Sequence, residues 1–199
     1  MSLLSLAVAS MLAVAGCSAG TVGSDSAVGS DSAVGSDSAV VSDARDPAAC
    51  PVLPDGFAYL NTIDPSIDVD LRYASTNNFT GEVVDGYEEA NAVVLREDAA
   101  IALAGVQATL ADAGLGLRVY DGFRPTRAVD FFMEWALTDD DRTRADYYPS
   151  FEKPELFELG YIAEQSGHSL GGTVDLTLIE LDTGEALDMG GLFDLFDDF

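Results

Sequence analysis

The sequence predicts an α+β domain in which helices flank an antiparallel or mixed central sheet. Three observations support this fold class. Segments typical of strands and helices follow one another in the order strand, helix, strand, helix, strand, strand. The run Asp182-Thr183-Gly184-Glu185 has the composition of a hairpin turn, which favours antiparallel pairing late in the chain. With 199 residues, the chain is long enough for one domain with a sizeable core.

The first half of the domain is predicted to hold one strand and one long helix. Residues 67–73 alternate between apolar and polar side chains, which indicates a strand. Residues 74–87 contain asparagines and glycines and predict a loop. Apolar residues at helical spacing predict a helix over 95–113, and Gly114 is the expected signal for its end.

The second half begins with a predicted strand over 116–120. A helix over 126–137 follows, and Pro125 suits its first turn. An acidic loop over 138–150 then leads to a short helical turn over 154–159.

The last predicted strand covers 173–179, and the chain returns beside it over 186–189 after the hairpin turn. Strand side chains alternate between faces, so one face is expected to be apolar and the other polar. The apolar face comprises Val174, Leu176 and Leu178, and the polar face comprises Thr173, Asp175 and Thr177.

The N-terminal region is predicted to be a signal and a tether. Residues 1–17 are apolar and end in small residues before Cys17, which resembles a bacterial lipoprotein signal with Cys17 lipidated. The alternative is an ordinary cleaved signal with an incidental cysteine, since no lysine or arginine precedes the apolar run. Residues 18–49 repeat Val-Gly-Ser-Asp-Ser-Ala and predict a disordered linker. The folded domain is therefore expected over 50–199.

The charge balance excludes one class of partner. Asp and Glu number 35 against 9 Lys and Arg, giving a net charge of −26 with no basic stripe. Such a chain is not expected to bind nucleic acid, and it would be repelled by anionic membrane surfaces. Contact with a membrane is expected only through the lipid anchor. The sequence gives no indication of oligomeric state.

A glycine-rich loop contains the only histidine, His168, and Asp175 follows it on the last predicted strand. An imidazole and a carboxylate brought together in this way suit a divalent metal, zinc first. The alternative is a solvated histidine and an aspartate that faces water, because two ligands do not make a site.

Arg124 is the second candidate for chemistry. It lies between a predicted strand and a predicted helix, where its guanidinium could hold a carboxylate or a developing oxyanion. The alternative is a structural ion pair with Asp121 or Asp130.

Several motifs together resemble one family and occur in that family's order. They are Leu71-Arg72-Tyr73-Ala74, Asn78-Phe79-Thr80-Gly81, Val84-Asp85-Gly86-Tyr87, Asp121-Gly122-Phe123-Arg124-Pro125, Ser166-Gly167-His168-Ser169, Asp175-Leu176-Thr177-Leu178 and Leu181-Asp182-Thr183-Gly184-Glu185. Over roughly residues 55–199 the chain resembles the VanX-type D-alanyl-D-alanine dipeptidases. These are zinc peptidases whose fold is shared with D-Ala-D-Ala carboxypeptidases and the hedgehog amino-terminal domain.

The resemblance implies a role for each of six residues. His168 and Asp175 would be two of three zinc ligands, and Arg124 would stabilise the transition state. Tyr73, Ser166 and Asp194 would line the substrate pocket, with the last two near the ammonium group of the dipeptide.

The sequence departs from the family in one respect. The family has a Glu-x-x-His element that supplies the general base and the third zinc ligand, and this sequence contains no second histidine. We therefore expect the chain to lack its C-terminal segment, to bind zinc weakly and to hydrolyse little.

The function expected from the resemblance is zinc-dependent hydrolysis of the D-Ala-D-Ala dipeptide in the cell envelope, for turnover of cell-wall dipeptide. Two alternatives remain open. One is a non-catalytic envelope lipoprotein that binds cell-wall peptides, and the other is a D,D-carboxypeptidase that acts on peptidoglycan stems.

Overall fold

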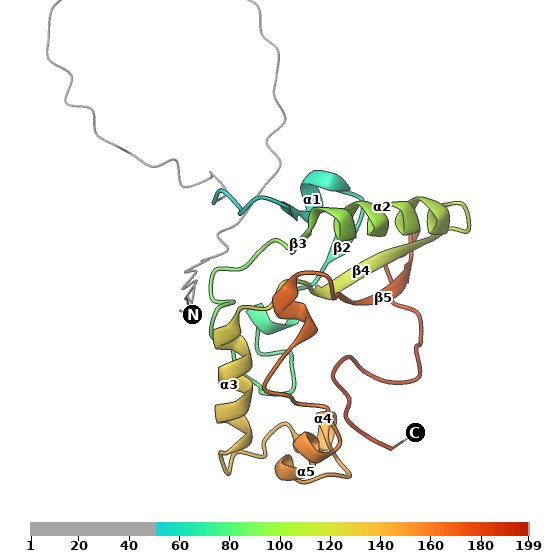
Figure 1. Cartoon of the computed structure of the whole chain (residues 1–199). Coiled ribbons are helices and arrows are strands. Elements are labelled where there is room, and N and C mark those ends of the chain that lie inside the picture. The colour runs from blue at the N-terminus through green and yellow to red at the C-terminus, as the bar shows by residue number, and fades with distance from the viewer. Residues whose placement is uncertain (1–50, 199) are drawn as a thin grey trace, which may run out of the picture.

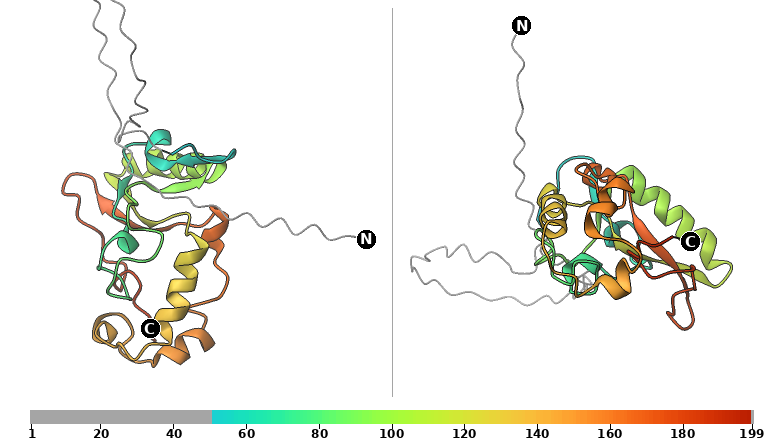
Figure 2. Two further views of the ribbon diagram at one scale, coloured as in Figure 1. Left: turned by 90° about the vertical axis from the view of Figure 1, so that its left-hand side faces the viewer. Right: turned by 90° about the horizontal axis from the view of Figure 1, so that it is seen from below.

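The computed structural model describes residues 51–198. Figure 1 and Figure 2 show that the sheets and helix α2 form one end of the molecule, whereas α4 and α5 form the other. Helix α3 runs from the sheet end toward α4 and α5. The fold is α+β, as predicted.

The strands form two small sheets. In the first, β1 (Phe57–Tyr59) pairs antiparallel with β3 (Val94–Arg96). In the second, β4 (Leu115–Asp121) lies between its neighbours, parallel to β2 (Asp68–Val69) and antiparallel to β5 (Asp175–Glu180). The central sheet is therefore mixed, which was one of the two predicted arrangements.

Helix α2 (Glu97–Ala111) packs on the central sheet. An aliphatic core between them includes Leu103 from the helix with Leu117 and Val119 from β4. The side chain of Gln107 accepts a hydrogen bond of 2.8 Å from the backbone N–H of Leu117. This buried bond fixes the position of the helix relative to the strand.

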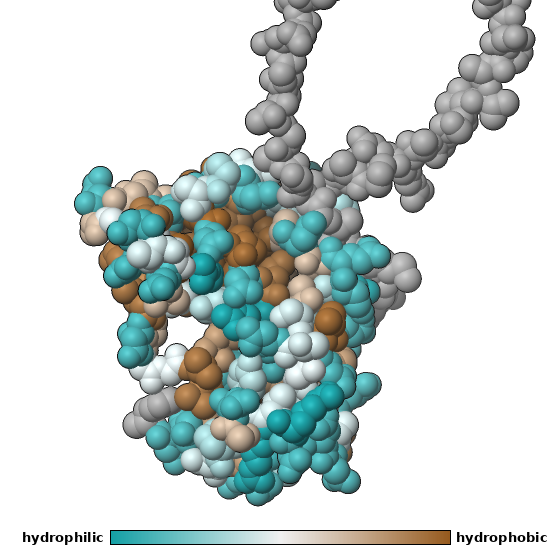
Figure 3. Space-filling view, turned by 180° about the vertical axis from the view of Figure 1, so that it is seen from behind, coloured by the Kyte–Doolittle hydropathy of each residue, from teal (hydrophilic) through white to brown (hydrophobic). Residues whose placement is uncertain are grey.

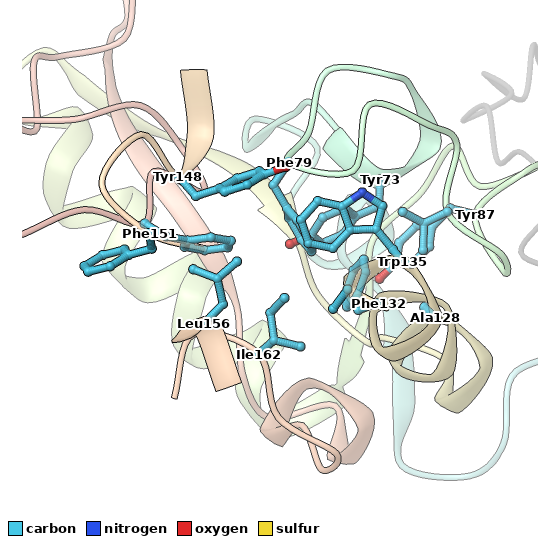
Figure 4. Close-up of a cluster of buried hydrophobic side chains, with 13 residues drawn as sticks. Tyr73, Phe79, Tyr87, Ala128, Phe132, Trp135, Tyr148, Phe151, Leu156 and Ile162 are labelled. Atoms are coloured by element: carbon cyan, nitrogen blue, oxygen red, sulfur yellow. The ribbon is translucent and has the colours of Figure 1, made fainter. Parts of the chain in front are cut away.

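A second core, made largely of aromatic side chains, fills the other end of the molecule (Figure 4). It lies among α3 (Thr126–Ala136), α4 (Arg144–Tyr147) and α5 (Lys153–Glu158). The Phe79 ring contacts Phe132 at 4.9 Å and Trp135 at 4.9 Å between centroids, in tilted and edge-to-face arrangements that aromatic rings favour.

The remaining short elements join these two ends. They are helix α1 (Leu60–Ile63), the 3-10 turn η1 (Arg72–Ala74) and the 3-10 turn η2 (Gly167–Leu170). Figure 3 shows that the back face of the molecule is largely hydrophilic, with hydrophobic residues gathered in its upper part.

Several boundaries predicted from the sequence were wrong. The predicted helix over 95–113 begins two residues late, because Val94–Arg96 pairs with β1 and the helix starts at the acidic pair after Arg96. The strand predicted over 67–73 is limited to Asp68–Val69, since the chain then turns into η1 and directs Tyr73 into the aromatic core. In both places tertiary pairing and packing override the local pattern.

Two further differences concern connections. The loop predicted over 138–150 contains the one-turn helix α4. The returning arm predicted over 186–189 forms a single bridge, between Ile179 and Ala186, rather than a full strand. Gly114, predicted to end α2, does have the left-handed conformation, with φ of +74°.

The predictions for the signal over 1–17, lipidated Cys17 and the linker over 18–49 lie outside the described residues. Within residues 51–198, no helix combines the length and the apolar character needed to cross a membrane.

Candidate functional site

A cavity of about 310 Å³ opens between the central sheet and the aromatic core. A cavity of this size suits a small ligand. All six residues singled out in the sequence line it: Tyr73, Arg124, Ser166, His168, Asp175 and Asp194. They come from five separate segments of the chain, so only the fold brings them together.

A β-bulge sets two of the acidic side chains beside the cavity. The register of β4 with β5 shifts after Val119, so that Asp121 pairs with Asp175. Bulges re-aim side chains at the ends of strands, often next to active sites. Here the bulge places two carboxylates within ion-pair distance of the same guanidinium nitrogen, Arg124 Nη2.

The loop that carries His168 is held tightly. Ser166 caps η2, because its Oγ accepts a hydrogen bond of 3.2 Å from the backbone N–H of His168. Gly171 ends the turn with φ of +75°, and a Cβ there would lie 2.5 Å from the Phe57 ring. Only glycine fits this position, so the backbone on both sides of His168 is fixed.

His168 and Asp175 have the geometry of neighbouring metal ligands. Nε2 of His168 lies 3.4 Å from Oδ1 of Asp175. Two atoms bound tetrahedrally to one zinc ion would lie about 3.3 Å apart, given bonds of about 2.0 Å. Nδ1 of His168 lies 2.9 Å from the carbonyl oxygen of Gly122, which assigns the proton to Nδ1 and leaves Nε2 free as a ligand. The two residues therefore fit a zinc ion.

Arg124 pairs with both carboxylates at the bulge. Its Nη2 lies 2.8 Å from Asp121 and 3.4 Å from Asp175, so the structural ion pair weighed in the sequence does form with Asp121. The guanidinium also packs over the rings of Tyr73 and Phe132, at 5.1 and 5.3 Å from their centroids. It remains part of the cavity wall, so the ion pair orients the group without removing it from the site.

Asp121, expected from the sequence only as a possible ion-pair partner of Arg124, is the most connected side chain beside the cavity. Its side chain is 0% exposed. It accepts hydrogen bonds from the Tyr87 hydroxyl at 2.6 Å, from the Gly122 N–H at 2.9 Å and from Arg124 Nε at 3.0 Å, and Nδ1 of His168 lies 3.3 Å away. Its position at the end of a strand, next to the loop that holds Arg124, was the only signal in the sequence.

Within residues 51–198, one group of three side chains has ligand atoms close enough for a metal: Asp121, His168 and Asp175, within 4.8 Å of one another. Asp121 differs from the other two, because its oxygens already accept hydrogen bonds and it faces the Nδ1 side of the His168 ring. We therefore assign Asp121 to the support of the ligands rather than to the ligand set.

Asp194 lies on the opposite wall with an unsatisfied oxygen. Its Oδ1 accepts a hydrogen bond of 3.2 Å from the Tyr73 hydroxyl, while the buried Oδ2 has no partner. Burial, with a smaller contribution from Asp175, raises the pKa of Asp194 to about 8. Among the described residues it is the only non-glycine with positive φ, at 61°. This conformation and the unpaired oxygen indicate a residue held ready for a cationic group.

On the wall of the cavity that the central sheet forms (the sheet wall), burial and neighbouring charges shift the pKa values of two side chains. Burial by itself would lower the pKa of His168, but the nearby carboxylates of Asp175 and Asp121 raise it overall. Burial also opposes the charge of Arg124, yet Tyr73 and Asp121 raise its pKa above the ordinary value. Arg124 therefore carries its positive charge at every physiological pH.

The cavity also has an apolar wall that the sequence analysis did not identify. It consists of Phe79, Val129, Phe132, Tyr161, Ile162 and Phe196. These residues come from four different elements and loops, and no local pattern distinguishes them from other core residues. They limit the room beside Asp194.

Ser166 lines the cavity, but its Oγ already accepts the hydrogen bond from His168 N–H. Its hydroxyl proton is free to be donated. This geometry suits a carbonyl or carboxylate oxygen of a ligand at least as well as the ammonium contact that the resemblance implies.

Comparison with known proteins identifies the family. Residues 54–198 match the peptidase M15 family model described as D-ala-D-ala dipeptidase. The chain is 45% identical over 145 residues to a D-alanyl-D-alanine dipeptidase of Enterococcus faecalis, covering 72% of this chain and 71% of that protein. It is 46% identical over 142 residues to a D-alanyl-D-alanine dipeptidase of Streptomyces coelicolor, covering 71% and 70%.

A more distant relative is a D-alanyl-D-alanine dipeptidase of Escherichia coli, 33% identical over 135 residues, covering 68% of this chain and 59% of that protein. The expectation drawn from the sequence motifs is confirmed by these matches. The chain belongs to the D-Ala-D-Ala dipeptidase family of M15 peptidases.

Proposed function

We propose that this chain hydrolyses D-alanyl-D-alanine with the help of a zinc ion held by His168 and Asp175. The observation that carries the proposal is the pair of atoms 3.4 Å apart, His168 Nε2 and Asp175 Oδ1, in the same cavity as Arg124 and the unpaired carboxyl of Asp194. When bound, zinc would polarise the scissile carbonyl and acidify a water molecule.

Arg124 is placed to stabilise the negative charge that develops on the carbonyl oxygen. Its guanidinium is held by Asp121 and partly by Asp175, so it does not need to reorganise during the reaction. Such preorganised charge is usually a large contribution to catalysis.

Asp194 is placed to bind the free amino group of the substrate. Its Oδ2 is buried and unpaired, and a substrate ammonium would satisfy it. A longer peptide has no charged amino group at that point and would leave the carboxyl unpaired in an apolar cavity. This favours a free dipeptide over a peptidoglycan stem.

The third protein ligand of the family's zinc site is not among the described residues, since His168 is the only histidine in the sequence. We therefore propose that the chain as given binds zinc weakly and turns over slowly. Two ligands supply less binding free energy than three, and a general base of the Glu-x-x-His type is missing from residues 51–198.

The test combines elemental analysis with kinetics on the full chain. We expect zinc below one equivalent per chain, slow release of D-alanine from D-Ala-D-Ala, loss of that activity with a chelator and its return with added zinc. A pentapeptide stem should be cleaved more slowly still. No cleavage of either substrate at saturating zinc would support the non-catalytic alternative, and faster cleavage of the pentapeptide would support the carboxypeptidase.

Matched variants separate the site from general effects on the chain. His168→Ala and Asp175→Asn should abolish zinc-dependent turnover. Asp188→Asn removes an acid that does not line the cavity and should leave it unchanged.

We also propose a location at the cell envelope, with Cys17 carrying a lipid. Incorporation of labelled fatty acid into the wild-type chain, and its loss in Cys17→Ser, would support this. Equal labelling of both would contradict it.

A further inference from the structure

We propose that Asp121 and Tyr87 are positioning residues that hold Arg124 and His168 in their working places. The inference rests on the proposed function, because it concerns how that site is kept in order. Neither Asp121 nor Tyr87 lines the cavity, so both act through other side chains.

The two carboxylate oxygens of Asp121 contact different groups. Oδ1 accepts hydrogen bonds from the Tyr87 hydroxyl at 2.6 Å and from the Gly122 N–H at 2.9 Å. Oδ2 faces Arg124, with Nη2 at 2.8 Å and Nε at 3.0 Å, and His168 Nδ1 at 3.3 Å. Oδ1 therefore anchors the carboxylate to the frame, and Oδ2 presents it to the two functional groups.

The anchor itself is rigid. Tyr87 is 3% exposed and belongs to the aromatic core, where its ring contacts Tyr73 at 5.6 Å between centroids. Tyr87 is thus held by packing, and its hydroxyl cannot move away from Asp121 without disturbing that core.

The backbone of Gly122, the residue after Asp121, also contacts His168. Its carbonyl oxygen lies 2.9 Å from His168 Nδ1. A Cβ on Gly122 would lie 2.6 Å from Val93 Cγ1 and 2.9 Å from the Val94 carbonyl oxygen, so the backbone is wedged against β3. The side chain of Asp121 and the carbonyl of Gly122 therefore fix a guanidinium and an imidazole from adjacent positions of one segment.

This arrangement predicts that variants of Tyr87 and Asp121 change kcat more than they change KM. Loss of the Tyr87 hydroxyl leaves Oδ1 with one donor and lets the carboxylate rotate. Loss of the Asp121 charge removes the closer of the two carboxylate partners of Arg124. Both changes should lower kcat, because Arg124 acts on charge that develops in the transition state, and should change KM little.

The experiment measures Tyr87→Phe and Asp121→Asn in the full chain with saturating zinc. We expect kcat to fall by about 10-fold for Tyr87→Phe and by about 100-fold for Asp121→Asn, with KM within about 3-fold of wild type. In an Arg124→Ala background, Tyr87→Phe should cost less than about 3-fold more, and Asp121→Asn should cost clearly less than about 100-fold, because only its effect through His168 remains. If Tyr87→Phe lowered kcat by the same factor in the Arg124→Ala background as in the wild type, the proposal would be overturned.

Chemical rescue gives a second readout that a merely structural role would not affect. Guanidinium ion should restore part of the activity of Arg124→Ala, because it can bind between Asp121 and the cavity. It should restore none in Arg124→Ala combined with Asp121→Asn. Equal rescue in both would overturn the proposal.

The control for Tyr87→Phe is Tyr148→Phe. Tyr148 is 1% exposed in the same aromatic core, and it does not line the cavity. The Tyr148→Phe variant should have the kcat and KM of the wild type. If Tyr148→Phe lowers kcat as much as Tyr87→Phe does, the effect is one of core packing and the positioning role is wrong.

A readout without activity separates this proposal from the proposed function. The Arg124 Nε–H resonance, followed by nitrogen-15 NMR, should be slow to exchange in the wild type and fast in Asp121→Asn. If the wild type shows no turnover, the proposed function fails, and this signal still decides the role of Asp121. An unchanged Arg124 resonance in a folded Asp121→Asn would overturn the positioning role, and if Asp121→Asn does not fold, the same comparison is made with Tyr87→Phe.

Discussion

The two walls of the cavity differ in how completely their polar groups are paired. On the sheet wall, Asp175 contacts His168 and Arg124, both of which are held from behind by Asp121, and His168 also contacts the Gly122 carbonyl. The opposite wall, formed by the apolar and aromatic side chains around Asp194, is called the aromatic wall here. On it, Asp194 has one hydrogen bond, from Tyr73, and one buried oxygen without a partner. The sheet wall is thus fully paired within the protein, whereas the aromatic wall keeps one polar atom open to a ligand.

This difference indicates a division of labour. Groups that act on the reacting bond gain from being fixed in advance, since catalysis is impaired when they must reorganise. A group that selects the substrate gains from being unsatisfied without it, because a buried unpaired polar group disfavours molecules that lack the matching group. Variants on the two walls should therefore fail in different ways.

The largest effect is expected on the sheet wall from His168→Ala. Loss of one of the two proposed zinc ligands should reduce zinc binding below detection and lower kcat/KM by about 1000-fold or more, since a metal ion supplies several kcal/mol of transition-state stabilisation. Zinc content and D-Ala-D-Ala turnover measure this. Retained zinc in His168→Ala would show that the sheet wall does not hold the metal.

The next effect is expected on the aromatic wall from Asp194→Asn. Asparagine tolerates the left-handed backbone at this position, so the change tests charge rather than conformation. We expect kcat/KM for D-Ala-D-Ala to fall by about 100-fold, mostly through KM, with zinc content unchanged. An increase in KM with no change in kcat would support the assignment of substrate selection to the aromatic wall. A loss of zinc would contradict that assignment.

A pH profile tests the same wall without a substitution. Because burial raises the pKa of Asp194 to about 8, the carboxyl of the empty site is neutral at pH 7. Binding of an ammonium group requires the charged form, so KM should fall by up to about 10-fold per unit as the pH rises from about 6 to about 8. Asp194→Asn should flatten this slope. A KM that rises over this range would contradict the assignment.

The smallest effect concerns the loop that carries His168. Gly171→Ala should destabilise the fold by about 2 kcal/mol, from the positive φ of +75° and from the clash with Phe57. Gly184→Ala is the matched control, since Gly184 has φ of +71° with no atom near a Cβ and should cost about 1 kcal/mol. Thermal unfolding measures both. Equal losses would mean that packing against Phe57 does not hold this loop.

The sequence predicted which residues share one cavity better than it predicted the strand boundaries. Alternation along the last strand correctly directed Asp175 toward the loop of His168, because a side-chain period of two is a local property. The β3 strand was missed, since Val94–Arg96 becomes extended only by pairing with a strand some 35 residues earlier, and nothing local marks that.

Asp121 shows the same limit within the site. Its partner Tyr87 lies 34 residues away in the chain, and the hydroxyl–carboxylate contact depends on how the aromatic core packs against β4. The β-bulge that sets Asp121 opposite Asp175 is likewise a property of the paired strands. Residue types and motifs indicated which side chains gather at one cavity, and tertiary packing decided what each one contacts.

The segment that carries Asp194 has a consequence for how this enzyme family can diversify. It is seated by Phe193 against Tyr73 and Tyr120, and by the Phe196 N–H on the Tyr147 carbonyl, and none of these contacts involves His168 or Asp175. On the roles proposed above, replacing this short stretch would change which molecules bind and would leave His168 and Asp175 in place. Selection can thus explore new substrates on one side of the cavity while the chemistry on the other side is inherited unchanged.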